Sequence, residues 1–157
     1  MPEITTYTDI ITLERAKRYL RVDDTLSEDD EEITSMIKAS FTFIERYTNH
    51  LFGARDKSQM VPPTIYDYPI NSISDVTEED WDNYYQRNMD MYCNEYRQAV
   101  LTSYNAGYIN VEDVPEDFIQ AALQIIKVWY FEAEKQVNDT LIPISVKQIL
   151  DTYRRFV

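Results

Sequence analysis

The residues that could do chemistry in this chain are few and lie far apart. The only histidine, His50, falls where a long predicted helix ends, and the sequence offers no evident partner for it. The only cysteine, Cys93, has no histidine nearby and no neighbour that would lower the pKa of its thiol. No glycine-rich phosphate loop and no nucleophile elbow is present. The sequence therefore predicts that the protein is not an enzyme.

Acidic residues are abundant, and one run could in principle bind a cation. The segment "DDTLSEDDEE" at residues 23–32 has seven acids in ten positions. A calcium loop needs a glycine at its sharp turn and alternating ligands, and this run has neither. We interpret it as a helix start, with Ser27 as the cap and Asp30 as the capping-box acid. We expect no metal, nucleotide or other cofactor.

Composition excludes several further classes of protein. The chain has 157 residues and a formal net charge of −13, which argues against adhesive binding to nucleic acid or to anionic membrane. No apolar run has the length of a membrane span, and the first residues lack the layout of a signal peptide. The 13 tyrosines suit surfaces that become interfaces, because the ring is apolar and its tip is polar. A cytosolic protein is the simplest reading.

Four helices are expected from apolar periodicity and capping residues. The first starts after Thr12, and the second is a long helix over residues 27–49. The third is opened by Pro115 and is apolar over residues 118–131, apart from one polar stripe. The last covers residues 145–156, with Ser145 as its cap. The second helix has its buried stripe at Ile33, Met36, Ile37, Ser40, Ile44 and Tyr47, broadened by Phe41 and Phe43.

Strands are expected only in the middle of the chain. Residues 65–73 predict two short strands broken near Pro69, and residues 98–108 predict one strand that ends in a turn. In that turn Asn105 and Gly107 are the residues that tolerate a positive φ, which turns the chain back toward the third helix. The predicted fold is mainly α: a small helical bundle around two long helices, with a short antiparallel β-hairpin and a C-terminal helix, in one domain over residues 1–157.

Several segments, taken in order, resemble one known family. They are Leu20–Arg21, Tyr47–Thr48, "YPINSISDV", "SYNAGY", "VPEDFIQAALQIIKVWYFE" and Tyr153–Arg154. Together they resemble the head–tail connector proteins of tailed bacteriophages, which are also called adaptor or head-completion proteins. The resemblance covers residues 10–76 and 98–157. Residues 77–97 depart from it as an acidic, aromatic insertion or extended hairpin tip.

The resemblance implies a structural role in the virion. Such proteins form a homo-oligomeric ring, commonly a dodecamer, between the portal protein and the tail or neck proteins. The ring extends the DNA channel, so DNA passes without specific binding, and a strongly acidic wall suits that passage. The expected location is the head–tail junction of the virion, after assembly in the host cytoplasm, with no membrane contact.

Two other functions stay open at this point. A small protein of charge −13 could be a DNA-mimic inhibitor that presents carboxylates to a DNA-handling protein. A hydrolase with unrecognised catalytic acids is the second alternative. Self-assembly or portal binding would separate the connector from the mimic, and a substrate screen would test the hydrolase.

Candidate partner contacts combine aromatic residues with arginine, the types that dominate interface energetics. The first group lies in the C-terminal segment 144–157, which we expect to dock on the portal or on a neighbouring subunit, and the second in the insertion. The residues are Tyr153, Arg154, Arg155, Phe156, Trp81, Tyr84 and Tyr85. Alternatively, the last helix covers the core of its own domain. The acids near residues 23–32 or 78–82 are expected to face the channel or solvent and not to lie at the subunit contacts.

Overall fold

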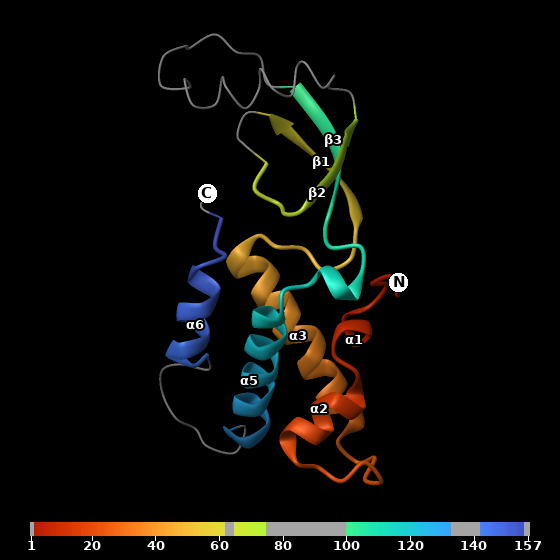
Figure 1. Cartoon of the computed structure of the whole chain (residues 1–157), viewed down its shortest axis with the longest axis vertical. Helices are drawn as coiled ribbons and strands as arrows, with labels where there is room; N and C mark the ends of the chain where they lie inside the picture. Colours follow the sequence, from red (N-terminus) through yellow and green to blue (C-terminus); the bar gives the residue numbers. More distant parts are fainter. Residues whose placement is uncertain (1, 62–64, 75–99, 133–141, 156–157) are drawn as a thin grey trace.

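The computed structural model describes residues 2–61, 65–74, 100–132 and 142–155. In Figure 1 the helices form a bundle, and a small sheet extends from one end of it. This arrangement confirms the predicted mainly α fold. The elements in chain order are α1 (Tyr7–Ile10), α2 (Leu13–Leu20), α3 (Asp30–Thr48), β1 (Arg55–Val61), β2 (Ile70–Ser74), β3 (Val100–Ala106), the 3₁₀ helix η1 (Val111–Asp113), α5 (Glu116–Glu132) and α6 (Ile144–Asp151).

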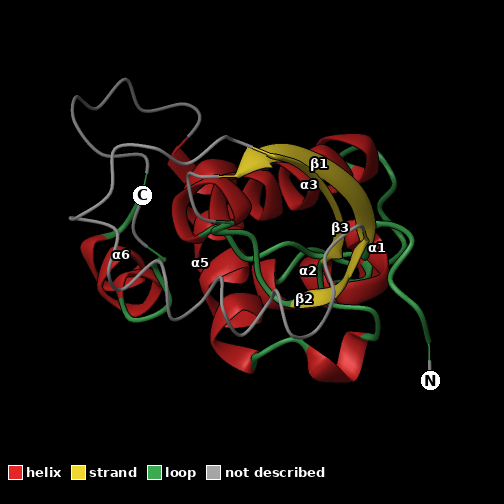
Figure 2. Ribbon diagram, turned by 90° about the horizontal axis from the view of Figure 1, so that it is seen from above, coloured by secondary structure: helices red, strands yellow, loops and turns green. Residues whose placement is uncertain are grey.

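The two long helices, α3 and α5, pack against each other and supply half of the buried residues of the main core. Ile33, Ile37 and Ile44 of α3 are fully buried, as are Phe118 and Ile125 of α5. Met36, Phe43 and Tyr47 are only partly buried at the edge of the core. Helix α6 flanks the bundle on the side opposite α1 (Figures 1 and 2). Within the described ranges, no helix is long and apolar enough to cross a membrane.

The predicted start of α2 is correct, and that of α3 is wrong. The Thr12 hydroxyl accepts a hydrogen bond from the Arg15 backbone N–H at 3.2 Å, as a cap should. Helix α3 begins at Asp30 with Asp29 as its cap residue, so Ser27 is not the cap. The Asp30 carboxylate accepts a hydrogen bond from Lys17 Nζ at 2.8 Å, because that buried ammonium needs a charged partner.

Helix α6 also differs from its predicted bounds. It starts one residue before Ser145, with Pro143 as the cap residue, and it ends at Asp151, so the described residues after it are not helical. Val146 and Leu150 are fully buried, and α6 contacts both long helices. The helix therefore covers the core of its own domain, as the alternative reading had it.

The sheet has three strands in the order β1-β3-β2, and both neighbouring pairs are antiparallel. The predicted strand before Gly107 is confirmed as β3. Strand β1 was not predicted, because its sequence "RDKSQMV" is too polar to show a buried face. Only β2 forms in the region where two strands were expected. Before it, Tyr68 makes an isolated bridge with His50, which ties the sheet connection to the end of α3.

Both glycines of the chain lie where the sheet joins the bundle. Gly107 has a φ of +124° and Gly53 a φ of +93°, which confirms the predicted positive φ at Gly107. Asn105, the other residue expected to allow it, lies in β3 and has no positive φ. The two segments are hydrogen-bonded side by side, with the Gly53 N–H donating to the Tyr108 carbonyl at 3.1 Å. A Cβ on Gly107 would lie 2.4 Å from the Gly53 carbonyl oxygen, so this junction requires glycine for space as well as for φ.

Candidate interaction surfaces

The residues that follow α6 are held against the end of α3. The Arg155 N–H donates to the Thr48 carbonyl at 3.2 Å, and Asn49 Nδ2 donates to the Arg155 carbonyl at 2.9 Å. The Tyr153 hydroxyl donates to Asp117 Oδ2 at 2.7 Å. The structure therefore brings together three of the seven predicted contact residues. The other four, Trp81, Tyr84, Tyr85 and Phe156, lie outside the described residues, as does the 77–97 insertion.

Both arginines lie over tyrosine rings at the surface. The Arg154 guanidinium is 5.1 Å from the centroid of the Tyr47 ring, and that of Arg155 is 4.8 Å from the centroid of Tyr68. Both arginine side chains are exposed. We call these four residues the C-terminal surface. It combines guanidinium groups with aromatic faces, a composition typical of energetically important contacts.

His50 lies directly beneath this surface and is not an unpartnered helix-end residue. It is only 6% exposed, and its Nδ1 is 2.9 Å from the Tyr108 hydroxyl. The rings of Tyr68, Phe118 and Tyr153 also contact it. Burial lowers the pKa of the imidazole to about 4, and the nearby Arg155 charge adds to this effect. The sequence alone could not reveal this cluster, because its members come from distant segments.

A buried carboxylate, Glu45, connects the bundle to the start of the sheet and was not predicted. Its Oε1 accepts hydrogen bonds from the Phe52 N–H at 2.8 Å and from Arg55 Nη2 at 2.5 Å. Its Oε2 accepts one from the Tyr7 hydroxyl at 3.1 Å. Glu45 is only 9% exposed although it follows the buried stripe of α3. The position of Glu45 next to that stripe, at helical spacing, could have indicated burial, but the charge of a glutamate indicates the solvent face.

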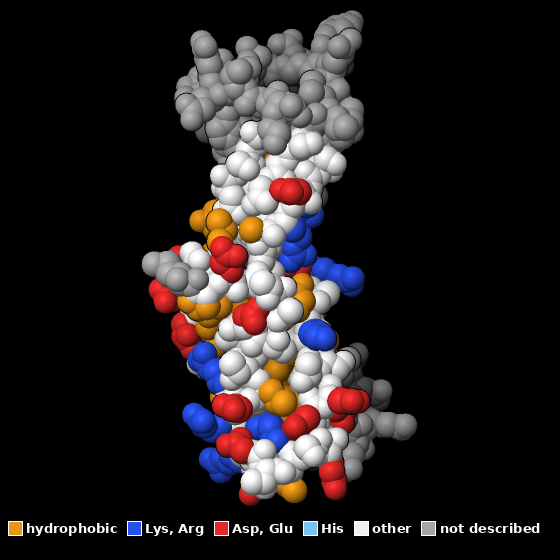
Figure 3. All heavy atoms as spheres, turned by 90° about the vertical axis from the view of Figure 1, so that its right-hand side faces the viewer, with side chains coloured by type: hydrophobic (Ala, Val, Ile, Leu, Met, Phe, Trp, Pro, Cys, Tyr) orange, Lys and Arg blue, Asp and Glu red, His pale blue; other side chains and the backbone are white. Residues whose placement is uncertain are grey.

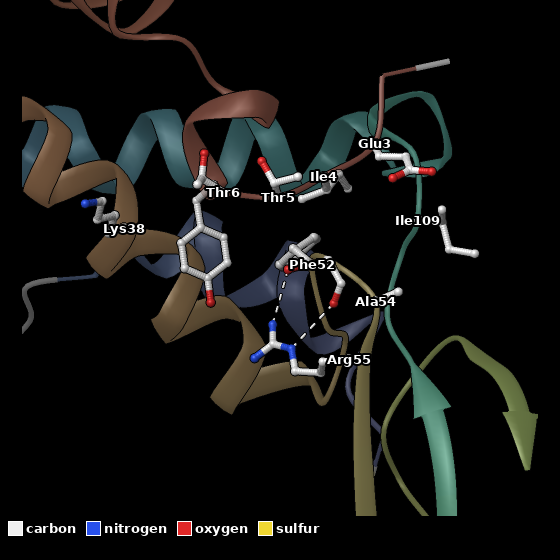
Figure 4. Close-up of a pocket in the computed structure, with 11 residues that line it drawn as sticks. Glu3, Ile4, Thr5, Thr6, Lys38, Phe52, Ala54, Arg55 and Ile109 are labelled. Carbon is white, nitrogen blue, oxygen red and sulfur yellow. Dashed lines mark hydrogen bonds between the residues drawn. The ribbon is translucent and has the colours of Figure 1, made fainter. Parts of the chain in front are cut away.

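A cleft of about 690 Å³ lies beside this carboxylate, between the N-terminal segment and the start of β1. We call it the N-terminal cleft. Ile4 and Phe52 lie in its middle, with Lys38 at one end and Glu3 and Ile109 at the other (Figure 4). On the face that carries α1, Figure 3 shows basic side chains gathered just below the sheet.

The prediction that no metal or cofactor is bound concerns the whole chain, and the structure bears on metal sites only in the described part of it. No group of three or more histidine, cysteine, aspartate or glutamate side chains there is placed to hold a metal ion. Asp9 is one of the acids with a shifted pKa, which is lowered by hydrogen bonds from the backbone and side chains of Thr5 and Thr6. That arrangement caps α1 and offers no reactive group.

Replacing Glu45 by alanine tests whether this carboxylate fixes the sheet to the bundle. The variant leaves the buried Phe52 N–H without its acceptor and removes the carboxylate partner of the Arg55 guanidinium, which keeps backbone carbonyls as acceptors. We expect the free energy of unfolding to fall by about 2 kcal/mol, measured by urea denaturation. The control is Glu116→Ala, which removes an ion pair whose side chains are 43% and 61% exposed. That change should cost less than about 1 kcal/mol, and equal losses would contradict the assignment.

Comparison with known proteins shows the family. The sequence matches the phage gp6-like head-tail connector protein family over residues 10–157. The chain belongs to this family. No curated protein matches the connector at a significant level. A solved structure, the neck of an empty GTA particle computed with C6 symmetry, includes a chain of the same fold, with a TM-score of 0.60 and 13% identity, and the match covers 99% of the connector and 95% of that chain.

These findings confirm the resemblance stated from the sequence. The family match includes the C-terminal surface, the His50 cluster and all but the first residues of the N-terminal cleft. The 13% identity of the GTA neck chain limits that comparison to the fold. A structural connector role is therefore the function that family membership supports for this protein, ahead of the DNA-mimic inhibitor and the hydrolase.

Proposed function

We propose that this connector forms a ring in the virion, between the portal and the tail or neck proteins, and extends the DNA channel there. The observation that carries the proposal is the family match over residues 10–157. The fold shared with a chain of a C6-symmetric neck supports a ring, because such symmetry repeats each contact around an axis. A dodecamer is compatible with sixfold symmetry. The role requires no catalytic step and no cofactor.

Charge supports the passage of DNA through such a ring. Each subunit has a formal net charge of −13, and an acidic wall repels phosphate. In the 23–32 run, the exposed acids include Glu31 and Glu32 in the first turn of α3. We propose that these two face the channel or solvent. The 78–82 acids lie outside the described residues.

A cryo-EM reconstruction of the particle neck tests the proposed function. We expect density for repeated copies of this helical bundle directly below the portal, with DNA able to pass along the axis. Particles made without the protein should lack this layer and should not join tails. A chain found elsewhere, or absent from the particle, would refute the proposal. A stable complex of one copy with a DNA-handling enzyme would instead favour the mimic.

The C-terminal surface is proposed to contact the portal. Replacing Arg154 and Arg155 together by serine removes both guanidinium groups and leaves the buried residues of α6 in place. We expect portal binding in co-sedimentation to weaken at least tenfold, roughly 1.4 kcal/mol, with the melting temperature nearly unchanged. Lys147→Ser, on α6 itself, is the control and should bind normally. Normal binding by the double variant would reject this contact.

A further inference from the structure

The connection between α2 and α3, residues 21–29, is held rigidly although its central side chain is exposed. We call it the Leu26 loop. Leu26 is 56% exposed, whereas the lysine beneath it, Lys17, is 3% exposed. Lys17 Nζ donates to the carbonyl of Asp24 at 3.1 Å and also to the carbonyl of Leu26. A buried ammonium is costly unless it is fully hydrogen-bonded. The hydrogen bonds that Lys17 requires therefore hold this loop in place, although the loop presents an apolar side chain to solvent.

Two free carboxylates flank that side chain. Asp24 and Glu28 are exposed and stand two residues before and two residues after Leu26. No hydrogen bond or ion pair with another described residue engages either carboxylate. Asp23 differs, because its Oδ1 accepts hydrogen bonds from the Thr25 N–H at 2.9 Å and the Thr25 hydroxyl at 2.7 Å. The loop therefore offers a leucine between two negative charges.

The N-terminal cleft offers the complementary chemistry. Lys38 at one end is exposed and makes no ion pair with any described residue, while Ile4, Phe52 and Ile109 provide apolar lining. Its volume of about 690 Å³ lies within the roughly 300–1,000 Å³ typical of sites that bury a ligand of moderate size. A short loop with one leucine matches this space.

We infer that the Leu26 loop of one subunit inserts into the N-terminal cleft of the next. The inference rests on the proposed ring. The loop lies at the end of the bundle away from the sheet, and the cleft lies beside the start of β1 (Figure 1). Each subunit thus presents one of each, as a head-to-tail contact around a ring requires. Leu26 enters the apolar part of the cleft, and Asp24 pairs with Lys38.

This contact also resolves the charge problem of the ring. Copies that each have a charge of −13 repel one another, so an interface with unpaired carboxylates would be unfavourable. The contact places one acid of the 23–32 run between subunits, which the sequence did not predict, but pairing Asp24 with Lys38 puts unlike charges there and leaves this carboxylate paired. Since Lys17 fixes the loop before binding, little additional ordering accompanies association.

Sedimentation velocity of the full chain over a range of concentrations tests the inference. The wild-type chain should self-associate, and Leu26→Ser, Asp24→Lys and Lys38→Glu should each weaken association at least tenfold. The chain with both Asp24→Lys and Lys38→Glu should regain it, because the charges are exchanged across the contact. Lys127→Glu is the matched control: it makes the same change on the exposed side of α5 and should associate normally.

The outcomes separate this contact from the proposed function. A monomeric wild-type chain, normal association of Leu26→Ser, or failure of the charge exchange to restore association would each overturn the contact. The side chains of Asp24, Leu26 and Lys38 are exposed, so the variants should fold normally. Circular dichroism and thermal melting of each variant check that they do. The position of the protein in the particle neck, seen by cryo-EM, tests the proposed function independently of these variants.

Discussion

Replacing Gly107 by alanine is expected to lower the free energy of unfolding by about 4 kcal/mol. Two effects add in this estimate. A φ of +124° is strained for any residue with a side chain, which accounts for about 1–2 kcal/mol. The new Cβ would also lie 2.4 Å from the Gly53 carbonyl oxygen and 3.2 Å from the Ala54 Cα, so backbone has to move, at a further cost of about 1–3 kcal/mol. Urea denaturation followed by circular dichroism measures the loss.

Gly53→Ala provides the matched control for this experiment. Gly53 also has a positive φ, +93°, but its nearest contact would be the Ile4 carbonyl oxygen at 3.3 Å. This variant keeps the conformational strain and omits the severe overlap, so we expect a loss of about 1–2 kcal/mol. Equal losses for the two variants would show that close approach of the backbones contributes nothing. If Gly107→Ala melts like the wild type, the described junction is incorrect.

Acidification from pH 7.5 to pH 5 is expected to destabilise the protein by about 2 kcal/mol through His50 alone. The pKa of the buried imidazole is about 4, against 6.5 for an ordinary histidine. Between these values the unfolded chain binds more protons than the folded one, so stability falls with falling pH. This contribution is complete above pH 6.5 and is lost by pH 4, a total of about 3 kcal/mol.

The comparison of wild type with His50→Phe isolates this effect from the carboxylates. Phenylalanine retains a ring among Tyr68, Phe118 and Tyr153 but cannot titrate. The difference in unfolding free energy between the two proteins should therefore shift by about 2 kcal/mol across the pH interval. Urea denaturation at each pH provides the values. Parallel pH profiles would contradict the burial of a neutral His50.

The sequence could specify those parts of the fold that depend on local chemistry. Thr12 predicted the start of α2, and Pro115 followed by two acids predicted the start of α5. Gly107 predicted a positive φ because the chain has only two glycines and this one follows a strand. Each of these signals acts within a few residues. The ordered set of such segments was also sufficient to recognise the family.

Local sequence patterns could not predict the contacts between distant segments. Glu45 is charged and was therefore left off the buried face of α3, but Tyr7 and Arg55 supply the partners that permit its burial. His50 looked like an unpartnered helix end, and only the approach of Tyr108 and Phe118 makes it a buried neutral group. The cost of burying a polar group depends on which partners the folded chain brings to it.

Local sequence thus determined that the four longer helices exist, the turn at Gly107 and the family, but it did not predict the short helix α1. Tertiary structure decided which polar residues are buried and which partners they bind. Ser27 is not the cap of α3, and Asp30, expected to complete that cap, binds Lys17. The same lysine donates to the carbonyl of Leu26, whose side chain is exposed. The strand β1 forms because β3 offers it a complete hydrogen-bonding edge, which outweighs its polar sequence. In each case a partner from another segment changes which local conformation or environment has the lower free energy.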